Sequence, residues 1–240
     1  MQPANRFEDI GGGVFVEVSR EHGFGEDALL LAQFAAPRPY EYACDLGTGC
    51  GIIPLWWCRR QPAPFVQAIE LQPTAAMMAK RSVERANLQH LITVYQADLK
   101  DWRTLLKPGS QHLVTMNPPY FAAGSGALSR SKAARISRHE GEGCTLAEVT
   151  QAAYGLLRQG GRFCICHKPV RLCDVLSILR ASRIEPKCLR FVYNNDNSQA
   201  WLFLCEAHKG GSKGLKVMPP FICYDAHGNP TKEYLNLFNI

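Results

Sequence analysis

The sequence lacks an apolar run that approaches the length of a membrane span, and residues 1–20 lack the apolar core of a secretory signal peptide. It also lacks internal repeats, low-complexity stretches and a Walker-type phosphate-binding motif. These absences argue against a membrane protein, a repeat architecture and a P-loop nucleotide-binding protein. A protein of the cytoplasm is therefore expected.

The ten cysteines include no CxxC pair, which argues against a zinc site and against the disulfide framework of a secreted protein. Several lie in apolar surroundings, namely Cys44, Cys58, Cys173 and Cys205. We expect buried free thiols and no metal.

The chain has 240 residues, of which 46% are hydrophobic, and a formal net charge of +6. This size suits one domain over residues 1–240. We divide it into an N-terminal segment (1–39), a core (40–208) and a C-terminal extension (209–240). The modest basic excess is compatible with a polyanionic partner such as RNA and does not require one. Oligomeric state cannot be read from these features.

Strand and helix patterns alternate from about residue 40. Strands are predicted over 40–46, 65–71, 91–97, 112–116 and 162–167, and helices over 51–60, 73–87, 145–158 and 170–182. We expect Gly160-Gly161 to stop the helix over 145–158. A polar turn at 194–198 joins two further strands, 189–193 and 200–206. The prediction is an α/β fold with a seven-stranded, mostly parallel sheet, an antiparallel C-terminal hairpin and helices on both faces.

A glycine-rich turn, Asp45-Leu46-Gly47-Thr48-Gly49-Cys50-Gly51, follows the first of these strands and opens a helix. Glycines at such a turn let the backbone bend sharply and approach a ligand closely. The predicted contacts here are Asp45, Gly47, Gly49 and Gly51. Taken alone the turn is equally compatible with a tight connection between a strand and a helix.

Acidic residues end the next two strands, and ligands bind beyond the carboxyl ends of parallel strands. Glu70, followed by Leu71, is placed to accept hydrogen bonds from ribose hydroxyls, and Asp98, followed by Leu99, from an adenine amino group. All four residues are predicted to bind a nucleoside-containing cofactor. A dinucleotide enzyme would share the first acidic positions, so the end of the fourth strand decides.

That fourth strand runs into Asn117-Pro118-Pro119-Tyr120. The side-chain oxygen of Asn117 and the carbonyl of Pro118 can accept both N–H bonds of a planar amine, whose delocalised lone pair makes it a poor nucleophile. Two prolines stiffen the turn, and Tyr120 offers a flat face for stacking. We predict Asn117, Pro118 and Tyr120 as catalytic, Asn117 also as a cofactor contact, and Pro119 and Tyr120 as substrate contacts.

Further substrate contacts are predicted upstream and downstream of these motifs. Upstream, Phe24 is expected to cover the pocket, and Asp27 is expected either to cap a helix or to face the cofactor. Downstream, residues 129–140 carry several cations and are predicted to follow a phosphate backbone, a solvated loop being the alternative. The residues concerned are Arg130, Arg135, Arg138 and His139.

These motifs together resemble the bacterial tRNA adenine-N(6) methyltransferases of the valine-tRNA type. The resemblance rests on Asp27–Leu31, on residues 45–51, 117–120 and 138–140, and on the lysine- and glycine-rich tail over 206–221. It implies the Rossmann-like fold of the class I methyltransferases, S-adenosyl-L-methionine as cofactor and tRNA as partner. The implied reaction is methylation of the exocyclic amine of adenine at position 37 of a valine tRNA.

Other functions remain open. A protein-glutamine N(5) methyltransferase shares the Asn-Pro-Pro-Tyr motif, but about 40 residues before the first core strand are few for its helical substrate-docking domain. An rRNA or DNA amino-methyltransferase with the same core is excluded less well. A non-catalytic RNA-binding module is disfavoured because Asn117 and the acidic strand ends are intact.

Overall fold

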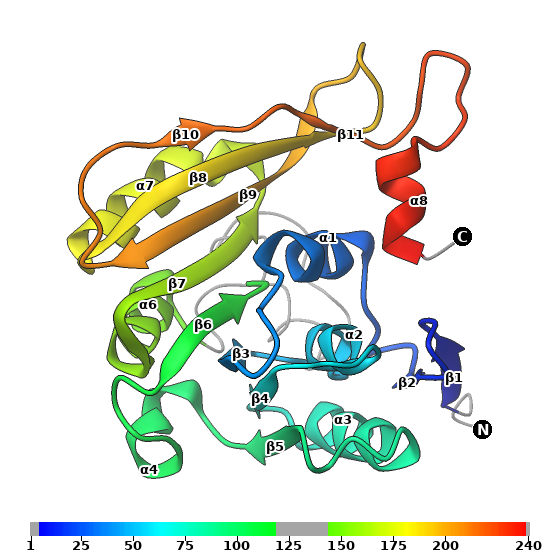
Figure 1. The fold of residues 1–240 in the computed structure, drawn as a ribbon, viewed down its shortest axis with the longest axis vertical. Coiled ribbons are helices and arrows are strands. Elements are labelled where there is room, and N and C mark those ends of the chain that lie inside the picture. Colours follow the sequence, from blue (N-terminus) through cyan, green and yellow to red (C-terminus); the bar gives the residue numbers. More distant parts are fainter. Residues whose placement is uncertain (1–4, 119–143, 239–240) are drawn as a thin grey trace.

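The computed structural model describes residues 5–118 and 144–238. Within them, a nine-stranded sheet has the order β10-β8-β9-β7-β6-β3-β4-β5, with β11 also paired to β8 (Figure 1). Five neighbouring strands are parallel: β7 (Leu157–His167), β6 (Gln111–Met116), β3 (Tyr42–Leu46), β4 (Phe65–Glu70) and β5 (Ile92–Gln96). The strands β8 (Ile184–Tyr193) and β9 (Ala200–Lys209) form the antiparallel hairpin, and the predicted α/β fold is confirmed. The predicted number of seven strands is wrong, because two short strands also pair with β8.

Helices cover both faces of the sheet and bury one apolar core on each. The helices α1 (Glu26–Ala35), α2 (Ile52–Cys58) and α3 (Pro73–Arg85) pack on one face, and α4 (Trp102–Leu105), α6 (Leu146–Leu156) and α7 (Leu172–Ala181) on the other (Figure 1). Side chains alternate across each strand, so Ala43 belongs to the first core and its neighbour Cys44 to the second. A strand buried on both faces explains why the core strands read as continuous apolar runs.

The 3₁₀ turns η1 (Leu99–Asp101) and η2 (Pro169–Arg171) precede α4 and α7 respectively. Sequence patterns did not predict the hairpin of β1 (Arg6–Asp9) and β2 (Phe15–Val18), or α8 (Lys232–Phe238). The two-residue strands β10 (Lys216–Val217) and β11 (Phe221–Ile222) also went unpredicted, because each is too short to show a period. Both extend the sheet beyond β8.

The prediction that Gly160-Gly161 stops the helix over 145–158 is wrong. Helix α6 ends at Leu156, the backbone of Leu157 is already extended, and both glycines lie inside β7. The pairing of β6 with β7 shifts register between Gln111 and Leu113, so the glycines occupy a strand irregularity. A second correction concerns Cys173, which is exposed on α7, whereas the other cysteines expected to be buried are so.

The C-terminal extension returns to the core. Helix α8 lies beside α1, and the hydroxyl of Tyr234 donates a 2.6 Å hydrogen bond to Oε1 of Glu26 (Figure 1). Arg190 on β8 forms a second link through Glu233, at 2.7 Å. No helix among the described residues has the length and apolar character needed to cross a membrane.

Candidate active site

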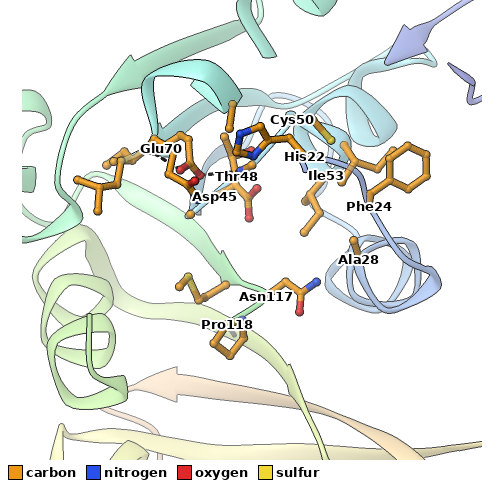
Figure 2. A pocket seen from close by; sticks show the side chains of 18 of the residues that line it. His22, Phe24, Ala28, Asp45, Thr48, Cys50, Ile53, Glu70, Asn117 and Pro118 are labelled. Atoms are coloured by element: carbon orange, nitrogen blue, oxygen red, sulfur yellow. Dashed lines mark hydrogen bonds between the residues drawn. The ribbon is translucent and has the colours of Figure 1, made fainter. Parts of the chain in front are cut away.

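A cavity of about 650 Å³ opens beyond the carboxyl ends of β3, β4, β5 and β6, and its volume is that of a typical small-molecule site. Residues 19–25, the loop after β3 and the ends of the other three strands line it (Figure 2). The turn before α1 therefore closes one side of a site that the sheet edge builds on the other. All the described residues that were predicted at the strand ends line this cavity.

The glycine-rich turn takes a conformation that other residues rarely adopt. Gly47, Gly49 and Gly51 have φ values of 65°, 58° and 85°. Gly51 is the N-cap of α2, and a Cβ atom there would lie 3.0 Å from Cβ of Ala79 on α3. The glycines therefore allow the turn to pass tightly between β3 and α2, as predicted.

Asp45 is the most deeply buried acid of the site. Its Oδ1 accepts a 2.7 Å hydrogen bond from the hydroxyl of Thr115 on the neighbouring strand β6. Burial raises the pKa of Asp45 to about 7, although the bond from Thr115 opposes the change. Among the described residues, Oδ2 of Asp45 and the hydroxyl of Thr48 have no hydrogen-bond partner of good geometry, although the hydroxyl of Thr48 also opposes the rise in the pKa of Asp45. Both residues line the cavity. Two buried polar atoms at one cavity wall indicate a polar ligand.

Glu70 is joined to the glycine-rich turn. Its Oε2 accepts a 2.8 Å hydrogen bond from the backbone N–H of Gly49, and Oε1 accepts one of 2.8 Å from Gln72. Burial raises the pKa of Glu70, and these backbone bonds oppose the change. Its carboxylate is thereby fixed at the cavity wall, next to Leu71, in the position expected for a ribose contact.

Asp98 lies at the far wall of the same cavity. Its Oδ1 accepts a 2.9 Å hydrogen bond from the backbone of Lys100 and so caps the 3₁₀ turn that begins with Leu99. The ammonium group of Lys100 lies 3.3 Å from Oδ2. Asp98 thus has a structural role in addition to the predicted adenine contact, whereas buried Leu99 supplies an apolar wall.

Asn117 follows β6 and points toward α1 across the cavity (Figure 2). Its Nδ2 donates a 3.0 Å hydrogen bond to Oδ2 of Asp27, and its Oδ1 accepts one of 3.1 Å from the thiol of Cys166. Asp27 is the second residue of α1 and does not cap it, because the N-cap is Gly25. The expectation that Asp27 caps the helix is therefore wrong, and Asp27 faces the site.

Phe24 and Pro118 also line the cavity, as predicted. The remaining predicted site residues lie outside the described residues: Pro119, Tyr120, Arg130, Arg135, Arg138 and His139.

Four further residues of the site were not predicted: His22, Thr48, Thr115 and Cys166. His22 is held in the turn before α1 by a 3.0 Å bond from its backbone N–H to the hydroxyl of Ser19, and burial lowers its pKa. Cys166 reaches the site through strand pairing, which no local sequence pattern shows. Met116 pairs with Ile165, so the next residue on β7 lies beside Asn117. Among the described residues, no group of three or more His, Cys, Asp or Glu side chains is arranged to hold a metal ion.

A family model and relatives of known name both match this chain. The family model described as methyltransferase small domain matches residues 12–171. The tRNA1(Val) (adenine(37)-N6)-methyltransferase of Erwinia tasmaniensis is 31% identical over 59% of the chain and 56% of its own length, so the chain spans little more than half of it. The protein of the same name from Aeromonas hydrophila subsp. hydrophila is 24% identical over 89% of the chain and 87% of its own length.

Among solved structures, a protein from Agrobacterium tumefaciens described as a predicted O-methyltransferase shares the fold. Its TM-score is 0.72 and its identity 22%, over 89% of this chain and 95% of that one. The similarity confirms the class I methyltransferase fold.

Proposed function

The chain belongs to the methyltransferase small domain family, and from this we propose that it methylates the exocyclic amine of an adenine in tRNA, with S-adenosyl-L-methionine as methyl donor. Position 37 of a valine tRNA is the proposed target, in line with the names of the relatives. One observation carries the reaction class. The Asn117 amide is held at the wall of a cavity whose other walls carry Asp45 and Glu70.

The residues present fit this cofactor. Oδ2 of Asp45 and the hydroxyl of Thr48, which have no well-formed hydrogen bond within the part of the chain that the structure describes, are suited to its ammonium and carboxylate groups respectively. Glu70 is positioned for ribose hydroxyls, and Asp98 for the adenine amine. When bound, the sulfonium supplies an electrophilic methyl group. These side chains would bind and orient it, and the surrounding loop over 19–25 would limit access of water.

The target amine needs acceptors more than it needs a base. An adenine amine has a delocalised lone pair, and its nitrogen becomes more positive as the methyl group is transferred. Oδ1 of Asn117 and the carbonyl of Pro118 would accept its two N–H bonds and stabilise that charge. Both residues directly follow β6, and this attachment would restrict the movement of the two acceptors.

For the tRNA, we propose that residues 129–140 and the C-terminal extension supply phosphate contacts, because both are rich in lysine or arginine. An unpaired adenine in an anticodon loop can be splayed into the cavity without opening a helix. We propose one domain over residues 1–240, which the bonds from Tyr234 to Glu26 and from Arg190 to Glu233 support.

The decisive experiment incubates the protein with labelled cofactor and, separately, with total tRNA, rRNA, DNA and a protein extract. Label in tRNA, followed by identification of N(6)-methyladenine at position 37, is the expected result. Label only in protein glutamine, or only in rRNA or DNA, would identify one of the alternative functions instead.

The matched variants are Asn117→Ala and, as control, Asn197→Ala in the exposed turn between β8 and β9. We expect the first to lose at least about 100-fold in kcat, the size of effect seen when a transition-state acceptor or donor is removed. Cofactor affinity, measured by calorimetry, should survive. If Asn117→Ala folds and loses cofactor binding as well, the residue belongs to the cofactor site and its assignment to the target is wrong.

A further inference from the structure

The Asn117 side chain is held between two partners from distant elements. Its nitrogen donates to Oδ2 of Asp27 on α1 at 3.0 Å, and its oxygen accepts from the thiol of Cys166 on β7 at 3.1 Å. These partners lie 90 and 49 positions away in the sequence. We infer that Asp27 and Cys166 are positioning residues that hold the Asn117 amide in a single orientation and so present its oxygen to the target amine.

An asparagine amide needs such help because its two ends have nearly the same shape. A 180° flip would place Oδ1 against the carboxylate of Asp27, where two acceptors meet, and would turn Nδ2 toward the thiol. One orientation satisfies both partners and the other satisfies neither well. An amide oxygen accepts up to two hydrogen bonds, so a bond from Cys166 is compatible with one from the target amine.

The carboxylate of Asp27 has a second effect. It accepts from the amide nitrogen, which polarises the amide and increases the electron density on its oxygen. The oxygen then becomes a better acceptor as positive charge develops on the target nitrogen. This contribution rests on the proposed function, since it requires that a target N–H contacts Asn117.

The local sequence around Asp27 explains how its carboxylate is held. Asp27 lies in the first turn of α1, where the helix dipole favours negative charge. A Cβ atom at Gly25 would lie 2.5 Å from Oδ1 of Asp27, although the backbone there (φ −112°) suits any residue. A side chain at position 25 would therefore require the carboxylate of Asp27 to move from the place it occupies.

Cys166 is suited to the other side of the amide. It is fully buried, and burial raises its thiol pKa well above the usual range, so the group remains an S–H donor at neutral pH. The thiol also lies 4.0 Å from the backbone carbonyl of Asp27, a longer contact than that to Asn117. Cys166 thus lies next to both other members of the group.

The first test compares Cys166→Ala, which lacks a donor, with Cys166→Ser, which keeps one. The control is Cys164→Ala, on the same strand and equally buried, whose thiol lies 3.9 Å from Glu206. We expect Cys166→Ala to lower kcat about tenfold, the effect of one hydrogen bond, with KM for cofactor and tRNA nearly unchanged. Cys166→Ser should recover most of this loss, and Cys164→Ala should keep the wild-type kcat.

The second test exchanges donor and acceptor. Asn117→Asp should lower kcat strongly, because two carboxylates would then face one another. Asp27→Asn should lower it less, because its amide oxygen still accepts from Asn117 but carries no charge. The double variant restores one amide and one carboxylate at the same pair of positions, and we expect its kcat to exceed that of Asn117→Asp. Asp27→Glu, which keeps the charge on a longer side chain, should retain more activity than Asp27→Asn.

The outcomes distinguish failure of the proposed function from failure of the inference that Asp27 and Cys166 position Asn117. If wild-type protein methylates no tRNA, the proposed function fails. If wild-type protein is active and Asn117→Ala is not, but Cys166→Ala matches Cys164→Ala and the losses of the exchanged pair simply multiply, positioning is refuted while the function stands. If Cys166→Ala does not fold, NMR of the wild-type Asn117 side-chain amide decides. Strong protection of its protons, lost in Asp27→Ala, supports the inference, and rapid exchange in the wild type overturns it.

Discussion

If Asp45 binds the cofactor as proposed, its buried carboxyl group should make cofactor binding dependent on pH near neutrality. Burial raises its pKa to about 7, and its Oδ2 lies at the cavity wall with no hydrogen-bond partner of good geometry among the described residues. A cofactor ammonium group binds the ionised form in preference to the neutral form. Raising the pH through 7 should therefore strengthen binding, because a larger fraction of the free protein is already in the competent state.

The magnitude follows from the ionised fraction. With a pKa of about 7, roughly one molecule in eleven is ionised at pH 6 and roughly ten in eleven at pH 8. The apparent Kd for S-adenosyl-L-methionine should thus be about tenfold higher at pH 6 than at pH 8. Binding should release about 0.9 proton at pH 6 and about 0.1 at pH 8, since each bound complex holds an ionised Asp45.

Calorimetry in buffers of different ionisation enthalpy measures both quantities. Two neighbouring groups also titrate and need their own controls: Glu70, whose pKa burial raises, and His22, whose pKa burial lowers. Asp45→Asn should bind weakly with a nearly flat pH profile, whereas Glu70→Gln and His22→Gln should keep the slope. An unchanged slope in Asp45→Asn would refute the reasoning, because the proton would then come from another group.

The same shift affects folding, with an opposite sign. An acid whose folded pKa lies above its unfolded value costs stability once the unfolded chain ionises. Without cofactor, the free energy of unfolding should fall between about pH 4 and pH 7 through this group, and Asp45→Asn should remove that part of the decline. Denaturant unfolding at several pH values measures it. A decline of the same size in Asp45→Asn would contradict the assignment.

Three further predictions concern the turn, a helix cap and the basic segment. Gly51→Ala should lower the free energy of unfolding by about 1–3 kcal/mol. Gly49→Ala should lower it less, because of these two positions only 51 would bring a Cβ atom against a neighbouring helix, and thermal melts compare the two variants. Thr145→Ala removes the capping box of α6 and should cost about 1 kcal/mol, whereas a serine there should cost much less. Arg135→Ala with Arg138→Ala should weaken tRNA binding and reduce the slope of log affinity against log salt by about two units, and an unchanged slope would exclude phosphate contacts from these side chains.

The sequence by itself determined the parts of this protein that depend on local order. Apolar runs separated by helical patterns predicted the parallel sheet, because buried strands and amphipathic helices have distinct periods. Glycines at 47, 49 and 51 predicted the tight turn, and acidic residues at strand ends predicted one common site. That second prediction succeeded because the carboxyl ends of parallel strands meet at one edge of the sheet, whatever the details of packing.

Only the tertiary structure decided how the site residues differ from one another. Asp45 is almost fully buried and so has a raised pKa, whereas Asp98 caps a 3₁₀ turn, and no local pattern separates the two. Helix α6 ends before the predicted stop because the residues from Leu157 onward belong to β7, which pairs with β6. The amide of Asn117 is oriented by Asp27 and Cys166, which only the packing of α1 and β7 around β6 brings within hydrogen-bond distance.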